Sequence, residues 1–386
     1  MRFACFETIS EQRRSEDWRR WPQPLRDGET LALATFAREN ARRIRYHQYL
    51  QWLCERQLAQ AARDAEKAGL SLGFCRDLAV GAAPDGCESW RNAARLLKGF
   101  SVGAPPDPFT REGQIWGLPP PNPLSWKADG CESFGGLLRA NMRHAGALRI
   151  DHAMGLARLF VVPEGGEALE GAYLSYPLDD LLGQLALESQ RAKCMAIGED
   201  LGTLPWGFSE RLAQAEVLSY RVLWFEREGV AFAPPAHYAQ KAMACVSTHD
   251  LPTLKGWWEG SDITEKLELG LLTLEAAHKE RETRRTDRRL LLEALAREEL
   301  PAGNDDPDAP FSDAFAGAVH AYAARTPAVL AMAQLDDLAG ETVAVNLPGT
   351  DRERPNWRRK LDVATPALFE SRLAQEILKG LRRNLD

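Results

Sequence analysis

The sequence predicts an α/β fold in which parallel strands alternate with helices. Short apolar runs of the kind that form buried strands recur along the chain, and longer stretches of helical character separate them. Strands separated by helices of this length indicate parallel βαβ units rather than a sandwich. With 386 residues, the chain is long enough for one barrel-sized unit or for two ordinary domains.

The first expected elements are a long helix and a strand. Residues 30–69 have helical character, because apolar side chains mark one face near the 3.6-residue period: Leu50, Leu53, Cys54, Leu58 and Ala61. The run "LSLGFCRDLAVG" follows and predicts a strand that closes with Asp77 and a turn of small residues. Asp77 is either a cap or a hydrogen-bonding group of that turn.

An aromatic, proline-rich stretch comes next. Residues 82–126 hold too many prolines and glycines for regular secondary structure, and too many tryptophans and phenylalanines for a disordered linker. We therefore expect an ordered loop that covers a site.

Three later strands each end in an acid. Helices are expected near 132–145 and 178–193, and the strands that follow them end at Asp151 and Glu199. "YRVLWFE" and "MACVSTHD" continue the alternation, and the second of these runs ends at Asp250. A last strand is expected within 328–337.

Pleat geometry groups the side chains at these strand ends. Side chains two apart on a strand share a face, so Arg149 should point the same way as Asp151, and Thr248 the same way as Asp250. In a parallel barrel the C-terminal ends of the strands line one mouth, where active sites form. The three acids could therefore converge on one substrate.

Composition and charge exclude several classes of function. The net charge of −7 does not favour nucleic acid or an anionic membrane. No apolar stretch approaches a transmembrane span, and the N-terminus lacks the apolar region of a signal peptide, so a cytoplasmic protein is expected. The seven cysteines lack the pairing of a disulfide framework and the spacing of a zinc site, which predicts reduced, mostly structural thiols.

Three carboxylates and an arginine at one mouth suggest glycosidic chemistry, in which one carboxylate attacks or stabilises the sugar and another protonates the leaving oxygen. A carboxylate metal site is the nearest rival, but such sites usually cluster their acids on one loop or helix, and the sequence has no such cluster. Each acid could also be a simple helix N-cap or a surface charge. Trp257 and Trp258 in "DLPTLKGWW" fit either a core or a surface on which a sugar ring stacks.

Five motifs resemble a known family. "GAPPDPFTREGQIWGLPPPNP", "RIDHAMGL", "AIGEDLG", "STHDLPTLKGWW" and "VNLPGTDRERPNWRRKL" occur in the order found in the 4-α-glucanotransferases, also called amylomaltases or disproportionating enzymes, and especially in their bacterial maltodextrin-utilising branch. The resemblance runs from about residue 15 to the C-terminus. It implies a (β/α)8 barrel of the α-amylase type, with residues 1–386 as a single catalytic-barrel portion and an inserted loop or subdomain at about 82–146.

The resemblance also implies an activity and its residues. This family moves a segment of a 1,4-α-glucan to the 4-hydroxyl of an acceptor glucan or glucose, so maltooligosaccharides and 1,4-α-glucans are the expected partners, with no cofactor and no metal. It implies Asp151 as nucleophile, Glu199 as general acid/base and Asp250 as the acid that stabilises the transition state. Arg149 would keep Asp151 ionised. The expected substrate-binding residues are Asp77, Asp107, Gln114, Trp116, Arg149, His249 and Asn346.

The chain departs from the family at its start. Family members carry the first barrel strands, with a glycine-rich loop, upstream of the region matched here, so the resemblance predicts a barrel that is incomplete. The strand near "LSLGFCRDLAVG" and the last strand should then each lack one partner, which would favour association until the missing region is supplied. An α-amylase-type glucan hydrolase and a non-catalytic glucan-binding fragment remain the alternative functions.

Overall fold

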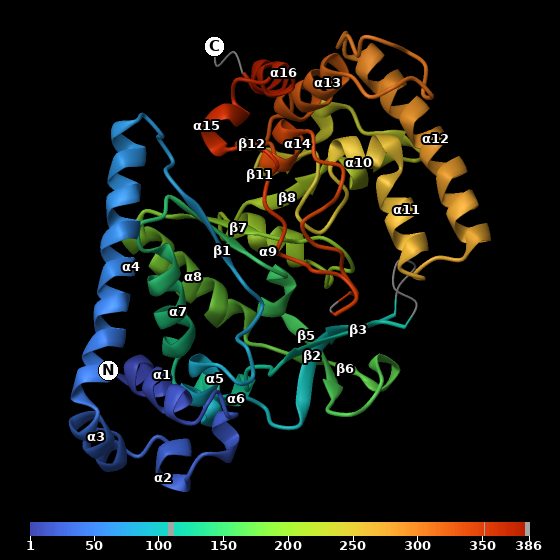
Figure 1. Cartoon of the computed structure of the whole chain (residues 1–386). Coiled ribbons are helices and arrows are strands. Elements are labelled where there is room, and N and C mark those ends of the chain that lie inside the picture. Colours follow the sequence, from blue (N-terminus) through green and yellow to red (C-terminus); the bar gives the residue numbers. More distant parts are fainter. Residues whose placement is uncertain (107–111, 351, 383–386) are drawn as a thin grey trace. The chain divides into compact units, whose positions relative to one another are not determined.

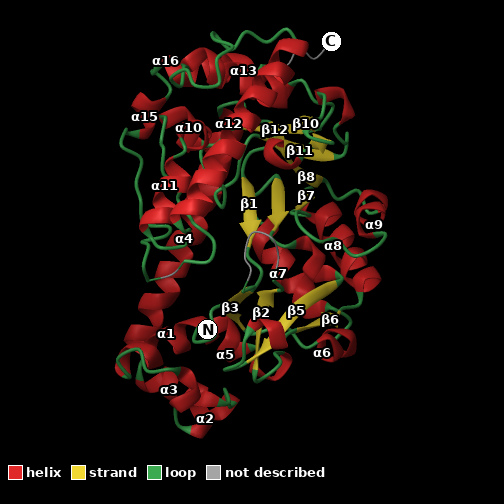
Figure 2. Cartoon of the chain, turned by 90° about the vertical axis from the view of Figure 1, so that its right-hand side faces the viewer, coloured by secondary structure: helices red, strands yellow, loops and turns green. Residues whose placement is uncertain are grey.

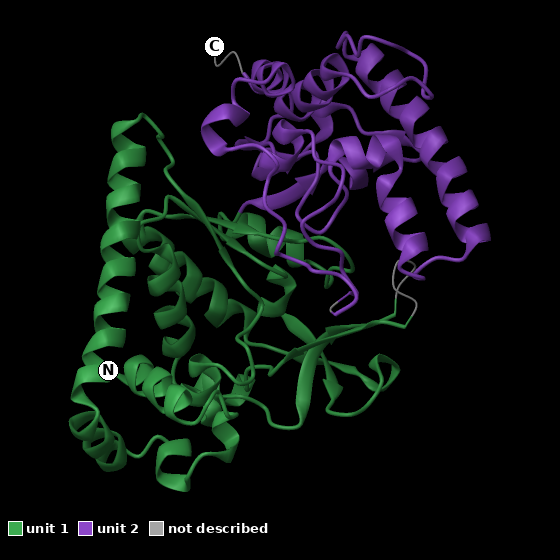
Figure 3. Ribbon diagram, viewed as in Figure 1, with its two compact units in different colours: residues 1–217 green, residues 218–386 purple. Residues whose placement is uncertain are grey.

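The computed structural model describes residues 1–106, 112–350 and 352–382. It divides into two compact units, Met1–Val217 and Leu218–Asp386 (Figure 3). Each unit has its own three-stranded parallel sheet and its own hydrophobic core. The alternation of strands and helices predicted from the sequence is therefore present in both units.

Unit 1 contains one parallel and one antiparallel sheet (Figure 2). The parallel sheet has the order β1-β4-β7, formed by β1 (Cys75–Leu78), β4 (Ala147–Ile150) and β7 (Met195–Gly198). The antiparallel sheet has the order β3-β2-β5-β6, formed by β2 (Phe100–Ala104), β3 (Gln114–Leu118), β5 (Arg158–Pro163) and β6 (Ala172–Ser175). The helices are α1 (Arg2–Gln12), α2 (Gln23–Arg26), α3 (Thr30–Glu39), α4 (Ala41–Lys67), α5 (Cys87–Arg91), α6 (Pro123–Ala128), α7 (Glu132–Met142), α8 (Leu178–Ala192) and α9 (Phe208–Gln214).

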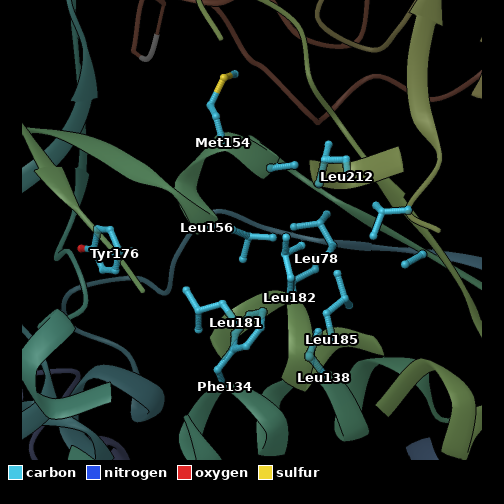
Figure 4. Packing of buried hydrophobic residues seen from close by; sticks show 14 of the residues in the cluster. Leu78, Phe134, Leu138, Met154, Leu156, Tyr176, Leu181, Leu182, Leu185 and Leu212 are labelled. Atoms are coloured by element: carbon cyan, nitrogen blue, oxygen red, sulfur yellow. The ribbon is translucent and has the colours of Figure 1, made fainter. Parts of the chain in front are cut away.

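The main core of unit 1 lies between the parallel sheet and the helices α7 and α8. Leu138 of α7 and Leu181 and Leu185 of α8 are completely buried, as is Leu148 of β4. Figure 4 shows the leucines of the two helices gathered beneath Leu78 of β1. Burying each such side chain contributes about 1.5–3 kcal/mol, so this packing fixes the sheet from which the candidate site residues project.

The stretch 82–126 contains more regular structure than the sequence suggested. We expected an irregular loop, but it supplies β2 and β3, which pair with each other, and β2 also pairs with β5. The pairing is irregular between Val102 and Gly103, where the register shifts. A Cβ atom at Gly103 would collide with the carbonyl oxygen of Gln114, so this glycine permits close approach of two strands rather than marking a loop.

The long N-terminal helix is interrupted and one of its faces is exposed. The expected helix over 30–69 is present as α3 and α4, which meet at Asn40 (φ −111°, ψ 27°). The buried residues of α4 are Ile44 and His47, whereas Leu58, on the apolar face seen in the sequence, is 44% exposed. The periodicity thus identified the helix, and Ile44 and His47 continue the same stripe at helical spacing, but the stripe is only partly buried or exposed from Leu50 onward. Figure 1 shows α4 running along one side of the unit.

Unit 2 is built around a second parallel sheet. Its order is β12-β11-β8, formed by β8 (Ser219–Val222), β11 (Ala242–Cys245) and β12 (Leu330–Met332), while β9 (Arg227–Glu228) and β10 (Ala231–Phe232) form a small antiparallel pair. The helices are α10 (Leu254–Glu259), α11 (Ser261–Glu268), α12 (Leu274–Arg297), α13 (Asp313–Ala324), α14 (Leu335–Ala339), α15 (Thr365–Leu368) and α16 (Arg372–Leu381). A Cβ atom at Gly380 would collide with the carbonyl oxygen of Gly317, so glycine lets α13 and α16 pack closely.

Two of the parallel-sheet edges in the described residues are those predicted from the sequence, but β7 and β8 also have one partner each and form two further edges that were not predicted. Within the described residues, β1 pairs with β4 alone and β12 pairs with β11 alone, as expected for the first and last of the matched strands. None of the seven cysteines forms a disulfide bond in the described residues, and four of them are buried: Cys5, Cys131, Cys194 and Cys245. In the part of the chain that is described, no helix combines the length and the apolar character needed to cross a membrane.

Candidate active site

Unit 1 brings four of the predicted residues together at the C-terminal ends of its parallel strands. Asp151 directly follows β4, and Glu199 directly follows β7, the adjacent strand. The amide of Asp151 donates to the carbonyl oxygen of Leu78 (3.0 Å), and the amide of Glu199 donates to that of Ile150 (2.9 Å). The ladder thus continues past the strands and fixes both acids at one edge of the sheet.

A buried arginine links two carboxylates at this edge. Arg149 is only 7% exposed, and its Nη1 lies 2.9 Å from Oδ1 of Asp151. The same Nη1 donates to both oxygens of Asp77, at 2.8 and 3.0 Å, because β1 sets Asp77 opposite Arg149. The predicted pairing of Arg149 with Asp151 is present, and the guanidinium stabilises the ionised form of Asp151.

Glu199 is held in a different electrostatic environment. Burial raises its pKa to about 7, and the negative charge of Asp151 adds to that effect. Its carboxylate accepts hydrogen bonds from the amides of Leu201 (2.8 Å) and His152 (2.9 Å), and these oppose the rise. The backbone amide of Leu201 has the larger of these two opposing effects.

The two acids therefore have divergent protonation behaviour. Asp151 is salt-bridged to Arg149, which favours its ionised form, whereas Glu199, with its pKa raised to about 7, is largely protonated below that pH. Environments that separate two neighbouring carboxyls in this way are typical of a nucleophile and a general acid.

His152 is a site residue that the sequence analysis missed. It adopts the left-handed conformation (φ 49°, ψ 56°), which turns its backbone amide toward Glu199. Burial lowers the pKa of its imidazole to about 4, so the ring is neutral near pH 7. A non-glycine residue at positive φ directly after an acid often marks a functional site, but the sequence alone gives no sign of this backbone conformation.

Trp116 and Gln114 lie on β3, in the segment that was expected to cover the site. The Trp116 indole stands edge-on to His152, with ring centroids 5.3 Å apart. Its Nε1 donates to Oε1 of Gln114 at 3.0 Å. Both residues are thus connected through His152 to Glu199. Asp107, the third residue expected in this segment, lies outside the described residues.

A cavity of about 350 Å³ opens at this edge of the parallel sheet within unit 1, and its lining does not include Gln114, Trp116 or Glu199. Asp77, Asp151 and His152 line it, together with parts of the segment 82–96 and of α7. Two of the acids at the sheet edge therefore face a space large enough for a small ligand.

Unit 2 holds the remaining predicted residues in a second cluster. Asp250 lies in the loop after β11, not on the strand: β11 ends at Cys245, so the expected shared face of Thr248 and Asp250 is wrong. Within this loop, Oγ1 of Thr248 accepts from the amide of Asp250 at 3.2 Å. Oδ1 of Asp250 accepts from Nδ2 of Asn346 at 2.6 Å, and its Oδ2 lies 3.3 Å from Nε2 of His249. The three predicted residues of this unit are therefore neighbours.

The loop that supplies Asn346 is organised by a buried arginine. Arg354 is 6% exposed, and its guanidinium donates to the carbonyl oxygen of Ala344 (2.5 Å), to Oδ1 of Asn356 (2.6 Å) and to Oε1 of Glu265 (2.8 Å). Asn356 in turn accepts from the amide of Leu347, the neighbour of Asn346 (3.1 Å). Arg354 thus fixes the backbone on both sides of Asn346.

Replacing Arg354 by methionine is expected to destabilise the fold. The variant leaves several part-buried acceptors without their donor and removes a buried charge, so we expect the free energy of unfolding to fall by about 2–4 kcal/mol. Urea denaturation measures this. Arg285→Met, which removes an exposed pair with Asp308, is the control and should change stability little. Equal losses in the two variants would contradict the anchoring role of Arg354.

Comparison with known proteins identifies the family. The model of glycoside hydrolase family 77, described as 4-alpha-glucanotransferase, matches residues 1–365. Two curated proteins named 4-alpha-glucanotransferase are similar to this chain: that of Mycobacterium tuberculosis (strain ATCC 25618 / H37Rv) is 39% identical over 362 residues, and that of Haemophilus influenzae is 37% identical over 355. These matches cover 92% and 91% of this chain but 49% and 50% of the relatives.

Solved structures give the same result. The crystal structure of amylomaltase from Corynebacterium glutamicum aligns with a TM-score of 0.86 and 32% identity, and covers 99% of this chain and 54% of that one. An amylomaltase from Streptococcus agalactiae, solved in complex with acarbose, aligns with a TM-score of 0.76 at 20% identity, which supports the fold. The protein is a mixed α/β protein of the amylomaltase kind. It belongs to the 4-alpha-glucanotransferase family, and it spans about half the length of the curated relatives it matches.

Proposed function

We propose that this chain carries the catalytic residues of a retaining 4-α-glucanotransferase. The observation that supports this most strongly is the pair formed by Asp151 and Glu199, one salt-bridged to Arg149 and the other with a pKa raised to about 7. Membership of the family supports the reaction class.

In the proposed first step, Asp151 attacks the anomeric carbon of a 1,4-α-glucan while Glu199 donates its proton to the glycosidic oxygen. The bond to the leaving glucan breaks as the bond from the sugar to Asp151 forms. Arg149 keeps Asp151 ionised until the attack. Glu199 is protonated because its site is poorly hydrated and lies beside a negative charge.

In the second step, the acceptor's 4-hydroxyl displaces Asp151, and the ionised Glu199 takes the proton of that hydroxyl. The anomeric configuration is retained because two displacements occur at the same carbon. Asp250 and His249 hydrogen-bond the sugar hydroxyls, with Asn346 orienting Asp250. Asp77, Asp107, Gln114 and Trp116 are assigned to substrate binding.

The proposed fold behind this chemistry is the (β/α)8 barrel of the α-amylase type, with residues 1–386 as one catalytic portion and an insertion at about 82–146. Two observations support it. Each unit contributes a three-stranded parallel sheet with helices between its strands. In each unit a proposed catalytic acid follows the C-terminal end of a strand, which is where barrels place their active sites.

Incubation with maltotriose tests the function. A transferase is expected to produce glucose and a ladder of longer maltooligosaccharides, because a sugar hydroxyl outcompetes water for the glycosyl intermediate. Maltose and glucose without longer products would indicate a hydrolase. Unchanged maltotriose, with binding detected by calorimetry, would indicate a glucan-binding fragment.

Trp116→Ala is expected to reduce transfer more than hydrolysis. An incoming sugar can use the indole as a stacking surface, whereas water cannot, so only the transfer step loses binding energy. The ratio of longer products to reducing ends released from maltotriose measures this. Equal losses in both activities would make Trp116 a packing residue against His152.

A further inference from the structure

Unit 2 contains a buried histidine and aspartate that the proposed reaction does not use. His320 of α13 is fully buried, and Asp337 of α14 is 3% exposed. Nε2 of His320 lies 3.6 Å from Oδ2 of Asp337, within the range of an ion pair. A buried ionisable pair is rarely the most stable way to fill a core, so its presence calls for a role beyond packing.

One ring nitrogen of His320 has a partner on its own helix. Nδ1 lies 2.9 Å from the carbonyl oxygen of Ala316, which can only accept, so Nδ1 donates. At 3.6 Å, Nε2 and Oδ2 of Asp337 are too far apart for a hydrogen bond, and neither atom has another hydrogen-bond partner among the described residues. His320 thus occupies the space beside Oδ2 and leaves Oδ1 as the oxygen of Asp337 that forms a hydrogen bond.

The other oxygen of Asp337 holds the start of a helix. Oδ1 accepts from the amide of Leu254, the first residue of α10, at 2.7 Å. The preceding residue, Thr253, donates from Oγ1 to the carbonyl oxygen of Glu341 at 2.6 Å and accepts from the amide of Gly256 at 3.0 Å.

The start of α10, which Asp337 anchors, is also the end of the loop that carries Asp250. Residues 246–253 join β11 to α10, and Oγ of Ser247 donates to the carbonyl oxygen of Pro252 at 2.6 Å, which ties the two ends of the loop together. The sheet fixes one end, and the Asp337 and Glu341 contacts fix the other. A shift of Leu254 would therefore displace Asp250.

We propose that Asp337, packed against His320, positions Asp250 by fixing the first turn of α10. Neither side chain contacts Asp250, so both are positioning residues. The predicted effect on catalysis rests on the proposed role of Asp250. The contact between His320 and Asp337, and the hydrogen bond from the Leu254 amide to Asp337, do not depend on that role.

The first experiment measures the contact itself in the full chain. In ¹⁵N NMR of histidine-labelled protein, the ring resonances of His320 are expected to shift in Asp337→Ala, because the neighbouring carboxyl is lost, and to stay in place in Arg285→Met. Unchanged ring resonances in Asp337→Ala would overturn the contact between the two side chains.

The second experiment measures the hold on α10. Hydrogen exchange at the Leu254 amide is expected to be at least about tenfold faster in Asp337→Ala, because its acceptor is lost, and nearly unchanged in Asp337→Asn, which keeps an acceptor. Unchanged exchange in Asp337→Ala would refute the anchoring.

The third experiment measures the effect on turnover of maltotriose. Asp337→Ala and His320→Leu are expected to lower kcat by about 10–100-fold with KM changed by no more than about threefold, since a misplaced group impairs reaction more than binding. Asp337→Asn should restore most of kcat. Ile377→Ala, at a fully buried site of the same core, is the control: it should lower Tm without lowering kcat.

The outcomes separate the two proposals. A kcat that falls only in proportion to Tm in Asp337→Ala and His320→Leu contradicts positioning by the pair. Any loss of kcat in the control Ile377→Ala is expected to be of that kind. An unsubstituted protein that leaves maltotriose unchanged contradicts the proposed function, and the two NMR measurements then still decide whether the pair holds α10.

Discussion

Asp151→Asn is expected to lower the turnover of maltotriose by roughly 10⁴-fold or more while the protein remains folded, because the change removes the nucleophile. Asparagine has nearly the same shape as aspartate and can still accept one hydrogen bond from Arg149. The loss should therefore fall on kcat. Initial rates of glucose release, with circular dichroism to verify the fold, measure the effect.

The matched control for this substitution is Asp179→Asn. Asp179 lies in the first turn of α8, in the same unit, and forms an exposed pair with Arg211. We expect wild-type turnover in this variant. Near-normal turnover in Asp151→Asn would show that another group forms the bond to the sugar.

Glu199→Gln is expected to lower turnover of maltotriose by about 10²–10⁴-fold, the range typical of a lost general acid. The loss should depend on the leaving group. Maltosyl fluoride needs little proton donation, because fluoride leaves readily, so release of fluoride in the first turnover, before Glu199 is needed as a base, should be much less impaired. Asp151→Asn, in contrast, should lose activity with both donors. Equal losses of Glu199→Gln with the two donors would contradict its role as an acid.

The pH profile gives a second test of Glu199. Its pKa is raised from 4.5 to about 7, so the proton needed in the first step is present below pH 7 and is lost as the pH rises through that value. For maltotriose, kcat/KM should therefore decline on the alkaline side with an apparent pKa near 7. This decline should be absent in Glu199→Gln. An unchanged alkaline decline in the variant would assign it to another group.

Much of the fold and part of the site could be predicted from the sequence. Asp151 and Glu199 could be placed because each directly follows an apolar run of strand length, and strand geometry then set Arg149 beside Asp151. These inferences depend on short-range periodicity, which the core of unit 1 preserves. Assigning different roles to the two acids required the family resemblance, because spacing cannot distinguish a nucleophile from an acid.

Other features depend on contacts that are distant in sequence. The glycines and prolines between 82 and 126 predicted irregular structure. Gly103, however, lies within a strand, and a neighbouring strand passes too close to it to leave room for a side chain. The position of Asp250 could not be predicted because β11 ends at Cys245, well before the motif does. His152 depends on a left-handed backbone conformation, and His320 meets Asp337 only through the packing of α13 and α14. None of these contacts leaves a periodic signal.

The most direct test of the central claim is to trap the glycosyl intermediate and locate it by mass spectrometry. A fluorosugar donor with a fluoride leaving group forms the intermediate faster than it is resolved, so the protein should gain the mass of one glycosyl group. Our account predicts that peptide mapping places this group on Asp151, and that Asp151→Asn gains none. A label on Glu199 or Asp250 instead, or turnover of maltotriose with inversion at the anomeric carbon, would contradict it.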